Sequence, residues 1–115
     1  MNIFEIYLKK IQNLIILNCK SLNMTADINM NGATIETPPL DFNFDLSTNI
    51  SLVLAKQTKQ SPIKLAESIK KIIKENLDDF STVEIAGPGF INFRFSTKKY
   101  QQLILNILRS KDKYK

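Results

Sequence analysis

The sequence of 115 residues contains no histidine, one cysteine and three glycines. The missing histidine excludes His general bases, Ser-His and Cys-His nucleophile pairs, and most zinc or iron sites. Cys19 has no second cysteine for a disulfide, a metal site or a redox motif. The glycines, at positions 32, 87 and 89, form neither a Walker-type loop nor a Rossmann pattern. The chain by itself is therefore a poor candidate for an enzyme, and we expect no cofactor and no metal in it.

Long apolar runs are also missing. None approaches the roughly 18 residues of a membrane span, so we expect no membrane partner. The N-terminal stretch MNIFEIYLKK is interrupted by an acidic residue and two lysines, which excludes a secretion signal. A single cysteine fits a cytoplasmic protein, which we take as the expected location. The length suffices for one small domain with one core.

Positive charge is concentrated in the second half of the chain. Residues 1–60 carry five basic and five acidic residues, whereas residues 61–115 carry eleven basic and six acidic residues. The whole net charge of +5 therefore lies in the second half. A one-sided basic excess favours a polyanionic partner such as nucleic acid. The alternative is that the charge serves only solubility.

The apolar periodicity predicts helices and paired strands in alternation. The predicted helices span 2–18, 47–59, 62–76 and a last segment that begins at Ser96 or Thr97, and the predicted strands span 25–30, 33–37, 82–86 and 90–96. Hairpins separated by helices indicate an antiparallel sheet. We therefore expect an α+β fold of two layers, with a four-stranded antiparallel sheet covered by helices on one face.

Local signals refine these boundaries. Asn31-Gly32 is typical of a hairpin turn, because both turn positions need positive φ. Ser61-Pro62 is typical of a helix start, with Ser as N-cap and Pro in the first turn. We expect Asp45 or Ser47 to cap the preceding helix. The segment 38–45 reads as extended and irregular.

The last helix carries an apolar stripe that we expect to face inward. The stripe consists of Tyr100, Leu103, Ile104, Ile107 and Leu108. The polar tail that follows has no apolar pattern. We therefore assign residues 1–110 to the domain and residues 111–115 to the start of a linker.

The stretch VEIAGPGFINFRF, residues 83–95, contains the candidate functional face. Alternate side chains of a strand point to opposite faces. One face carries Ile91, Phe93 and Phe95, and the other carries Phe90, Asn92 and Arg94. We expect the apolar face to pack on the helices, and Phe90 and Asn92 to project together toward solvent from the open face.

This second face has the chemistry that single-stranded RNA needs. An aromatic ring stacks on an unpaired base for roughly 1–3 kcal/mol. An amide reads a base edge, and a cation holds a phosphate. The alternative interpretation is that Phe90 folds into the core and that Arg94 is a solvated charge.

Two blocks of the sequence resemble the N-terminal additional domain of arginyl-tRNA synthetases. They are AGPGFINFRFS, residues 86–96, and DLSTNISLVLAK, residues 45–56. The resemblance covers nearly the whole chain and implies the element order α-β(2)-α-β(2). One departure is Phe44, where the family usually has Gly before the Asp of the second block. Asp45, Thr48 and Asn49 are interpreted as caps and loop staples rather than as RNA contacts.

The resemblance implies recognition of the D-loop at the outer corner of tRNA(Arg). The family positions that contact the base match Gly87, Phe90 and Asn92, with Phe90 stacking and Asn92 hydrogen-bonding the base edge. Some relatives carry Asn at the position of Gly87, so a side-chain contact is missing here. We add Arg94, Lys98 and Lys99 as candidate RNA contacts through phosphate.

The resemblance also implies what a full-length enzyme would contain. A Rossmann-type class I catalytic domain would follow this chain, bind ATP with magnesium and arginine, and join arginine to tRNA. We expect this chain to be a monomer. The alternatives are a protein-interaction module that uses the open sheet face and a free-standing RNA-binding protein.

Overall fold

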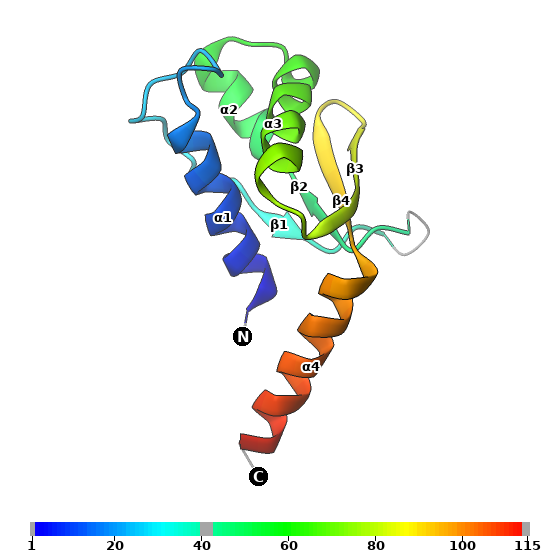
Figure 1. Ribbon diagram of the computed structural model, residues 1–115. Helices are drawn as coiled ribbons and strands as arrows, with labels where there is room; N and C mark the ends of the chain where they lie inside the picture. The colour runs from blue at the N-terminus through cyan, green and yellow to red at the C-terminus, as the bar shows by residue number, and fades with distance from the viewer. Residues whose placement is uncertain (1, 40–42, 114–115) are drawn as a thin grey trace.

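A computed structural model describes residues 2–39 and 43–113 (Figure 1). The elements in chain order are α1 (Ile3–Leu17), β1 (Ile35–Glu36), β2 (Leu46–Thr48), α2 (Ile50–Thr58), α3 (Pro62–Asn76), β3 (Phe80–Ala86), β4 (Phe90–Phe95) and α4 (Thr97–Lys113). Every helix in the described part of the chain is too short or too polar to span a bilayer.

The four strands form one antiparallel sheet in the order β1-β2-β4-β3. Helices α1, α2 and α3 pack on one face of this sheet, while no helix in the described part of the chain covers the other face (Figure 1). The core lies between these two layers. The predicted α+β architecture, with an antiparallel sheet covered on one face, is therefore confirmed.

Helix α3 forms as its sequence predicts. Ser61 caps it, since the Ser61 hydroxyl oxygen accepts a hydrogen bond from the Lys64 amide at 3.4 Å, and Pro62 occupies the first helical position. Its buried side chains recur at helical spacing and are Leu65, Ala66, Ile69 and Ile73. Helix α1 likewise buries one stripe, formed by Tyr7, Ile11 and Ile15.

The predicted N-terminal hairpin is wrong. A turn does occur at Asn31-Gly32, where Gly32 has φ +92°, but residues 25–30 form no strand. Strand β1 instead pairs with β2, which lies where we expected the start of a helix. The loop before β1 is held by α2, because the Gln57 side-chain oxygen accepts a hydrogen bond from the Asn29 amide at 3.0 Å. Of the predicted irregular segment 38–45, residues 40–42 lie outside the described residues.

The predicted caps of α2 are also wrong. This helix begins at Ile50, later than expected, because residues 46–48 are occupied by β2. Thr48 Oγ1 accepts a hydrogen bond from the Ile50 amide at 3.2 Å and donates one to the Thr34 carbonyl at 2.7 Å. Asn49 accepts from the Thr34 amide at 2.8 Å and donates to the Gly32 carbonyl at 3.1 Å. Thr48 and Asn49 therefore act as loop staples, as predicted.

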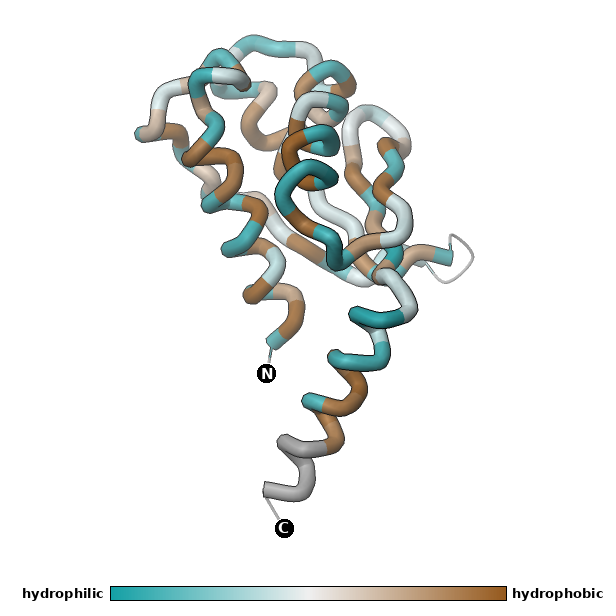
Figure 2. Tube along the Cα trace, in the orientation of Figure 1, coloured by the Kyte–Doolittle hydropathy of each residue, from teal (hydrophilic) through white to brown (hydrophobic). Residues whose placement is uncertain are grey.

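The inward packing predicted for the last helix is wrong for most of its stripe. Leu103 is buried, but Tyr100, Ile104, Ile107 and Leu108 are exposed. Figure 1 shows α4 leading away from the domain, and Figure 2 shows the apolar residues along its middle. The periodicity correctly predicts an amphipathic helix, yet β4 directs that helix away from the sheet. The helix continues to Lys113, into the range assigned to a linker.

A buried carboxylate ties the start of α4 to α1. Asp79 Oδ2 accepts a hydrogen bond from the Tyr7 hydroxyl at 2.6 Å and lies 3.7 Å from Lys10 Nζ and 3.5 Å from Lys99 Nζ. Burial alone would raise the pKa of Asp79, but the Tyr7 hydrogen bond and the two lysine charges outweigh it and lower this pKa. Burial, the Asp79 hydrogen bond and the Asp79 charge raise the pKa of Tyr7 far above its ordinary value. Tyr7 therefore remains a donor.

Asp79→Asn is expected to lower the free energy of unfolding at pH 7 by about 1–3 kcal/mol, because it removes a charged acceptor from a buried hydroxyl. The lowered pKa means that the stabilisation is present above the unfolded pKa of about 3.9 and is lost as the pH falls through the folded value. The difference from wild type should therefore shrink below about pH 4. Urea unfolding of wild type and Asp79→Asn, at pH 7 and below about pH 4, measures this difference in stability.

Asp78→Asn is the matched control, because Asp78 is the exposed neighbour of Asp79. It should leave the stability at pH 7 nearly unchanged. Equal losses in the two variants would contradict a special role for the Asp79 carboxylate.

Candidate nucleic-acid interface

The open face of the sheet carries a row of four polar side chains. Glu36 pairs with Ser47, Ser47 with Asn92, and Asn92 with Glu84, so the row crosses all four strands. Directly opposed residues of neighbouring strands share a face. The amide of Asn92 therefore lies in the middle of the row, and a carboxylate stands at each edge.

Phe90 stands next to this row, at the start of β4. The residue remains 39% exposed, whereas Ile91, Phe93 and Phe95 are buried against the helices. The predicted alternation along β4 is therefore confirmed. The interpretation of Phe90 as a core residue is disfavoured, because a substantial part of the side chain is open to water.

Asn92 lies deeper than we expected. It is on the same face as Phe90, but the residue is only 6% exposed. Both residues line a pocket of about 650 Å³, whose wall includes Pro38, Pro39 and the Gly87-Pro88 turn. The expectation that Asn92 projects freely into solvent is thus corrected: neighbouring strand β2 and the two prolines enclose it.

The amide of Asn92 keeps its hydrogen-bonding capacity. Among the described residues, the Asn92 side chain forms no hydrogen bond. No fully buried side-chain nitrogen or oxygen of these residues lacks a partner, and Asn92 lines the pocket. The Asn92 amide is therefore not sealed in the protein but opens into the pocket. An amide supplies both a donor and an acceptor, which suits the edge of a base.

The Gly-Pro-Gly turn holds Phe90 in place. Ser51, a fully buried residue of α2, donates a hydrogen bond from its hydroxyl to the Gly89 carbonyl. Gly89 has φ +142°, and a Cβ at this position would lie 2.9 Å from Pro62 Cβ. Only glycine fits such a contact without strain. The start of α3 and the start of α2 therefore fix the turn from which Phe90 emerges.

Gly87→Asn is expected to cost less than about 1 kcal/mol of stability, because Asn is among the residues that tolerate the left-handed conformation. Gly87 has φ +56°, and the nearest atom to an added Cβ is Phe90 Cδ2 at 3.9 Å. Gly87→Val is the control, since a branched side chain is strongly disfavoured at positive φ. Thermal unfolding compares them, and an equal loss in both variants would contradict the expectation.

Arg94 is engaged with a loop. Its guanidinium donates two hydrogen bonds to the Asn43 carbonyl, at 3.1 Å from Nε and 2.9 Å from Nη2. It also lies over the Phe44 ring, 5.1 Å from the ring centroid. Asp45 Oδ2 holds the same region by accepting a hydrogen bond from the Phe95 amide at 2.9 Å. Arg94 thus stabilises the loop that contains the unusual Phe44, and its phosphate contact stays a prediction.

The two lysines proposed as phosphate contacts lie at the far end of β4 from Phe90. Lys98 is exposed, while Lys99 forms the ion pair with Asp79 described above. The structure therefore brings together Gly87, Phe90 and Asn92 and separates them from Lys98 and Lys99.

Several residues of this pocket were not predicted from the sequence. Glu36 and Ser47 enter it from β1 and β2, and Pro38 and Pro39 form part of its wall. Strands of two and three residues are too short for alternation to reveal a face. The pairing of β1 with β2 was the missing information.

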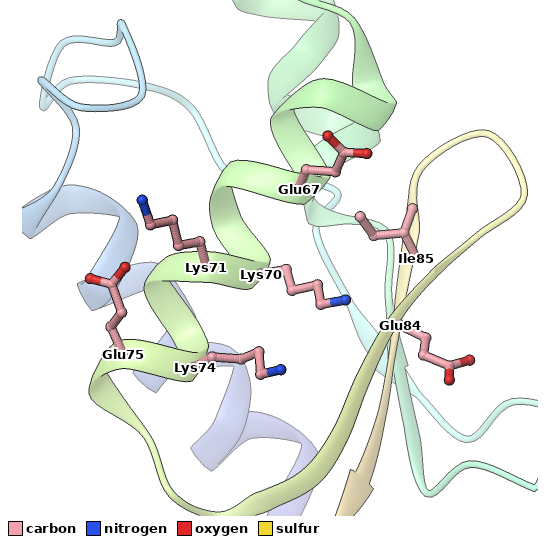
Figure 3. A pocket seen from close by; sticks show the side chains of 7 residues that line it. All are labelled: Glu67, Lys70, Lys71, Lys74, Glu75, Glu84 and Ile85. Carbon is pink, nitrogen blue, oxygen red and sulfur yellow. The ribbon is translucent and has the colours of Figure 1, made fainter.

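A second groove lies between α3 and β3 (Figure 3). It measures about 710 Å³ and is lined by Glu67, Lys70, Lys71, Lys74, Glu75, Glu84 and Ile85. Figure 3 shows Lys70 and Lys74 extending toward β3. Three lysines and three glutamates balance one another, so the groove has no net preference for a polyanion. None of the predicted RNA-binding residues lies in it.

Comparison with known proteins finds similarity to one enzyme family. The family model described as "Arginyl tRNA synthetase N terminal domain" matches residues 8–95. The arginine–tRNA ligase of Pelagibacter ubique is 36% identical over 118 residues, which cover 99% of this chain and 20% of that ligase. The arginine–tRNA ligase of Rickettsia akari is 40% identical over 114 residues, which cover 99% of this chain and 19% of that ligase. The chain spans about a fifth of the length of these relatives.

Proposed function

The chain belongs to the family of arginyl-tRNA synthetase N-terminal domains, and from this premise we propose that it binds the D-loop of tRNA(Arg) for an arginine–tRNA ligase. In this role an unpaired base would stack on Phe90 while its edge meets Asn92. The chain itself would supply no catalytic group. The joining of arginine to tRNA, with ATP and magnesium, would belong to a separate catalytic domain of a cytoplasmic, monomeric ligase.

One observation carries the proposal. The half-open ring of Phe90 and the amide of Asn92, which has no partner among the described residues, line the same pocket on the face of the sheet without helices. A ring and an amide at a shared pocket provide both stacking and edge recognition. A core-filling hairpin needs neither an exposed ring nor an open amide.

The exposed apolar stripe of α4 favours a second candidate, a protein-interaction module. A salt series distinguishes the two. Nucleic-acid binding releases counterions. Even two of the three candidate phosphate contacts, Arg94, Lys98 and Lys99, would therefore lower the affinity about tenfold between 50 and 200 mM salt. Docking through an apolar surface should respond much less.

The test is binding of this chain to a tRNA(Arg) transcript, measured across that salt range. A transcript with abasic nucleotides at the unpaired D-loop positions is the control, because it keeps the phosphate charge but offers no base there for stacking. Preferential, salt-sensitive binding to the intact transcript supports the proposal. Equal binding of both transcripts would overturn D-loop recognition.

A further inference from the structure

Phe90 and Asn49 both line two hollows on the surface of the domain. The first is the pocket of Glu36 and Asn92, which we call the sheet pocket. The second, which we call the helix hollow, has a volume of about 520 Å³ and lies against α2. It is lined by Asn31, Asn49, Leu52, Val53, Lys56, Gln57 and Phe90. The ring of Phe90 thus contributes to both.

The two hollows carry opposite charges. Glu36 is the one ionisable residue among the described residues that line the sheet pocket. Lys56 is the one ionisable residue among those that line the helix hollow. Both side chains are exposed, and neither takes part in an ion pair within the described ranges, where both ion pairs involve Asp79. Each charge is therefore available to a ligand.

The two parts of a nucleotide also differ in charge. Its base is neutral, whereas its phosphate carries a negative charge that a carboxylate repels and an ammonium attracts. We propose that this division of charge orients the bound nucleotide: Lys56 holds the phosphate in the helix hollow, and Glu36 keeps phosphate out of the sheet pocket so that the base enters it. The inference rests on the proposed function and adds two residues to the site.

The distances across the sheet fit this arrangement. Glu36, Ser47 and Asn92 lie in one row on three neighbouring strands, so about 10 Å separates the backbones of Glu36 and Asn92. A base that stacks on Phe90 and bonds to Asn92 would therefore lie within the field of the Glu36 carboxylate. A phosphate placed there would face that carboxylate without a described cation in the same pocket.

The test uses two D-loop stem-loop RNAs that differ at one position, one with the unpaired base and one with an abasic nucleotide there. Lys56→Gln should weaken binding of both RNAs by about fivefold, the upper range of an exposed ion pair. It should also reduce the salt slope by about 1. Lys59→Gln is the control, because Lys59 is an exposed lysine at the end of the same helix and lines neither hollow.

Glu36→Gln should have a different effect. Binding of the abasic RNA should increase about three- to fivefold, the range of one surface charge interaction, while binding of the intact RNA changes less than twofold. Discrimination between the two RNAs therefore decreases. Glu84→Gln is the control, since Glu84 stands at the opposite end of the same row and lines the other groove. Melting temperatures verify that all four variants fold.

The outcomes separate this inference from the proposed function. In one outcome, wild type prefers the intact RNA, but Lys56→Gln binds with the same affinity as Lys59→Gln, or Glu36→Gln with the same affinity as Glu84→Gln. This result overturns the division of roles and leaves the proposed function standing. Absence of any wild-type preference for the intact RNA overturns both. Only the opposed effects described above support the inference.

Discussion

Phe90→Ala is expected to weaken binding of tRNA(Arg) by about 5- to 100-fold, because loss of base stacking costs roughly 1–3 kcal/mol. The stability cost should be much smaller than the roughly 3–5 kcal/mol of a buried Phe→Ala change. The reason is that Phe90 is already 39% exposed and lies at the start of β4, outside the core cluster. Binding titrations and melting curves on the same samples check both parts.

Two further variants at this position separate stacking from packing. Phe90→Tyr keeps the flat ring and should bind nearly as well as wild type. Phe90→Leu keeps an apolar side chain but offers no flat face, so it should bind almost as weakly as Phe90→Ala while melting near wild type. Wild-type affinity in Phe90→Leu would contradict stacking as the source of binding. A large loss of stability with unchanged affinity per folded molecule would show that Phe90 serves the core.

Gly89→Ala should reduce the free energy of unfolding by about 2–5 kcal/mol, which combines backbone strain with overpacking. At φ +142° an L-residue is strained, and the added Cβ would lie 2.9 Å from Pro62 Cβ and 3.2 Å from the Pro62 carbonyl atoms. These atoms belong to the first turn of α3 and have little freedom to move away. Because a small domain has only about 5–15 kcal/mol of stability, this is a large fraction. Urea unfolding measures it.

Gly32→Ala is the matched control for this effect. Gly32 also has a positive φ, +92°, but the nearest atom to an added Cβ is Val53 Cγ2 at 4.0 Å. Gly32→Ala should therefore lower the free energy of unfolding only by the backbone strain, about 1–3 kcal/mol, which is less than the loss in Gly89→Ala. The Gly89 variant should also bind tRNA more weakly per folded molecule, since the displaced turn moves Phe90. Equal losses in both variants would show that the contact with Pro62 is unimportant.

The best predicted parts of the molecule are those specified by neighbouring residues. Ser61-Pro62 and the apolar spacing behind it predict α3 nearly to the residue, since a cap and a stripe are both local signals. The Gly-Pro-Gly turn and the alternation after it predict the β3–β4 hairpin and the two faces of β4. The candidate pair Phe90 and Asn92 follows directly from this alternation.

The poorly predicted parts depend on contacts between distant residues. β1 and β2 have two and three residues, too few for a periodic signal, and they become strands only because β2 lies beside β4. The same pairing places Glu36 and Ser47 beside Asn92, so this side chain lines a pocket where we expected it to project freely into solvent. The partner of the Arg94 guanidinium is likewise a backbone carbonyl 51 positions away.

The sequence by itself therefore determined the helices α1 and α3, the last hairpin, the overall layering and the choice of Phe90 and Asn92, because spacing, caps and turn residues act over a few positions. Only the tertiary structure decided what surrounds those two side chains, which charges line the two hollows beside Phe90, and that most of the apolar stripe of α4 is exposed. A periodic pattern specifies which side of an element is apolar, whereas strand pairing and the direction of the chain specify what meets that side.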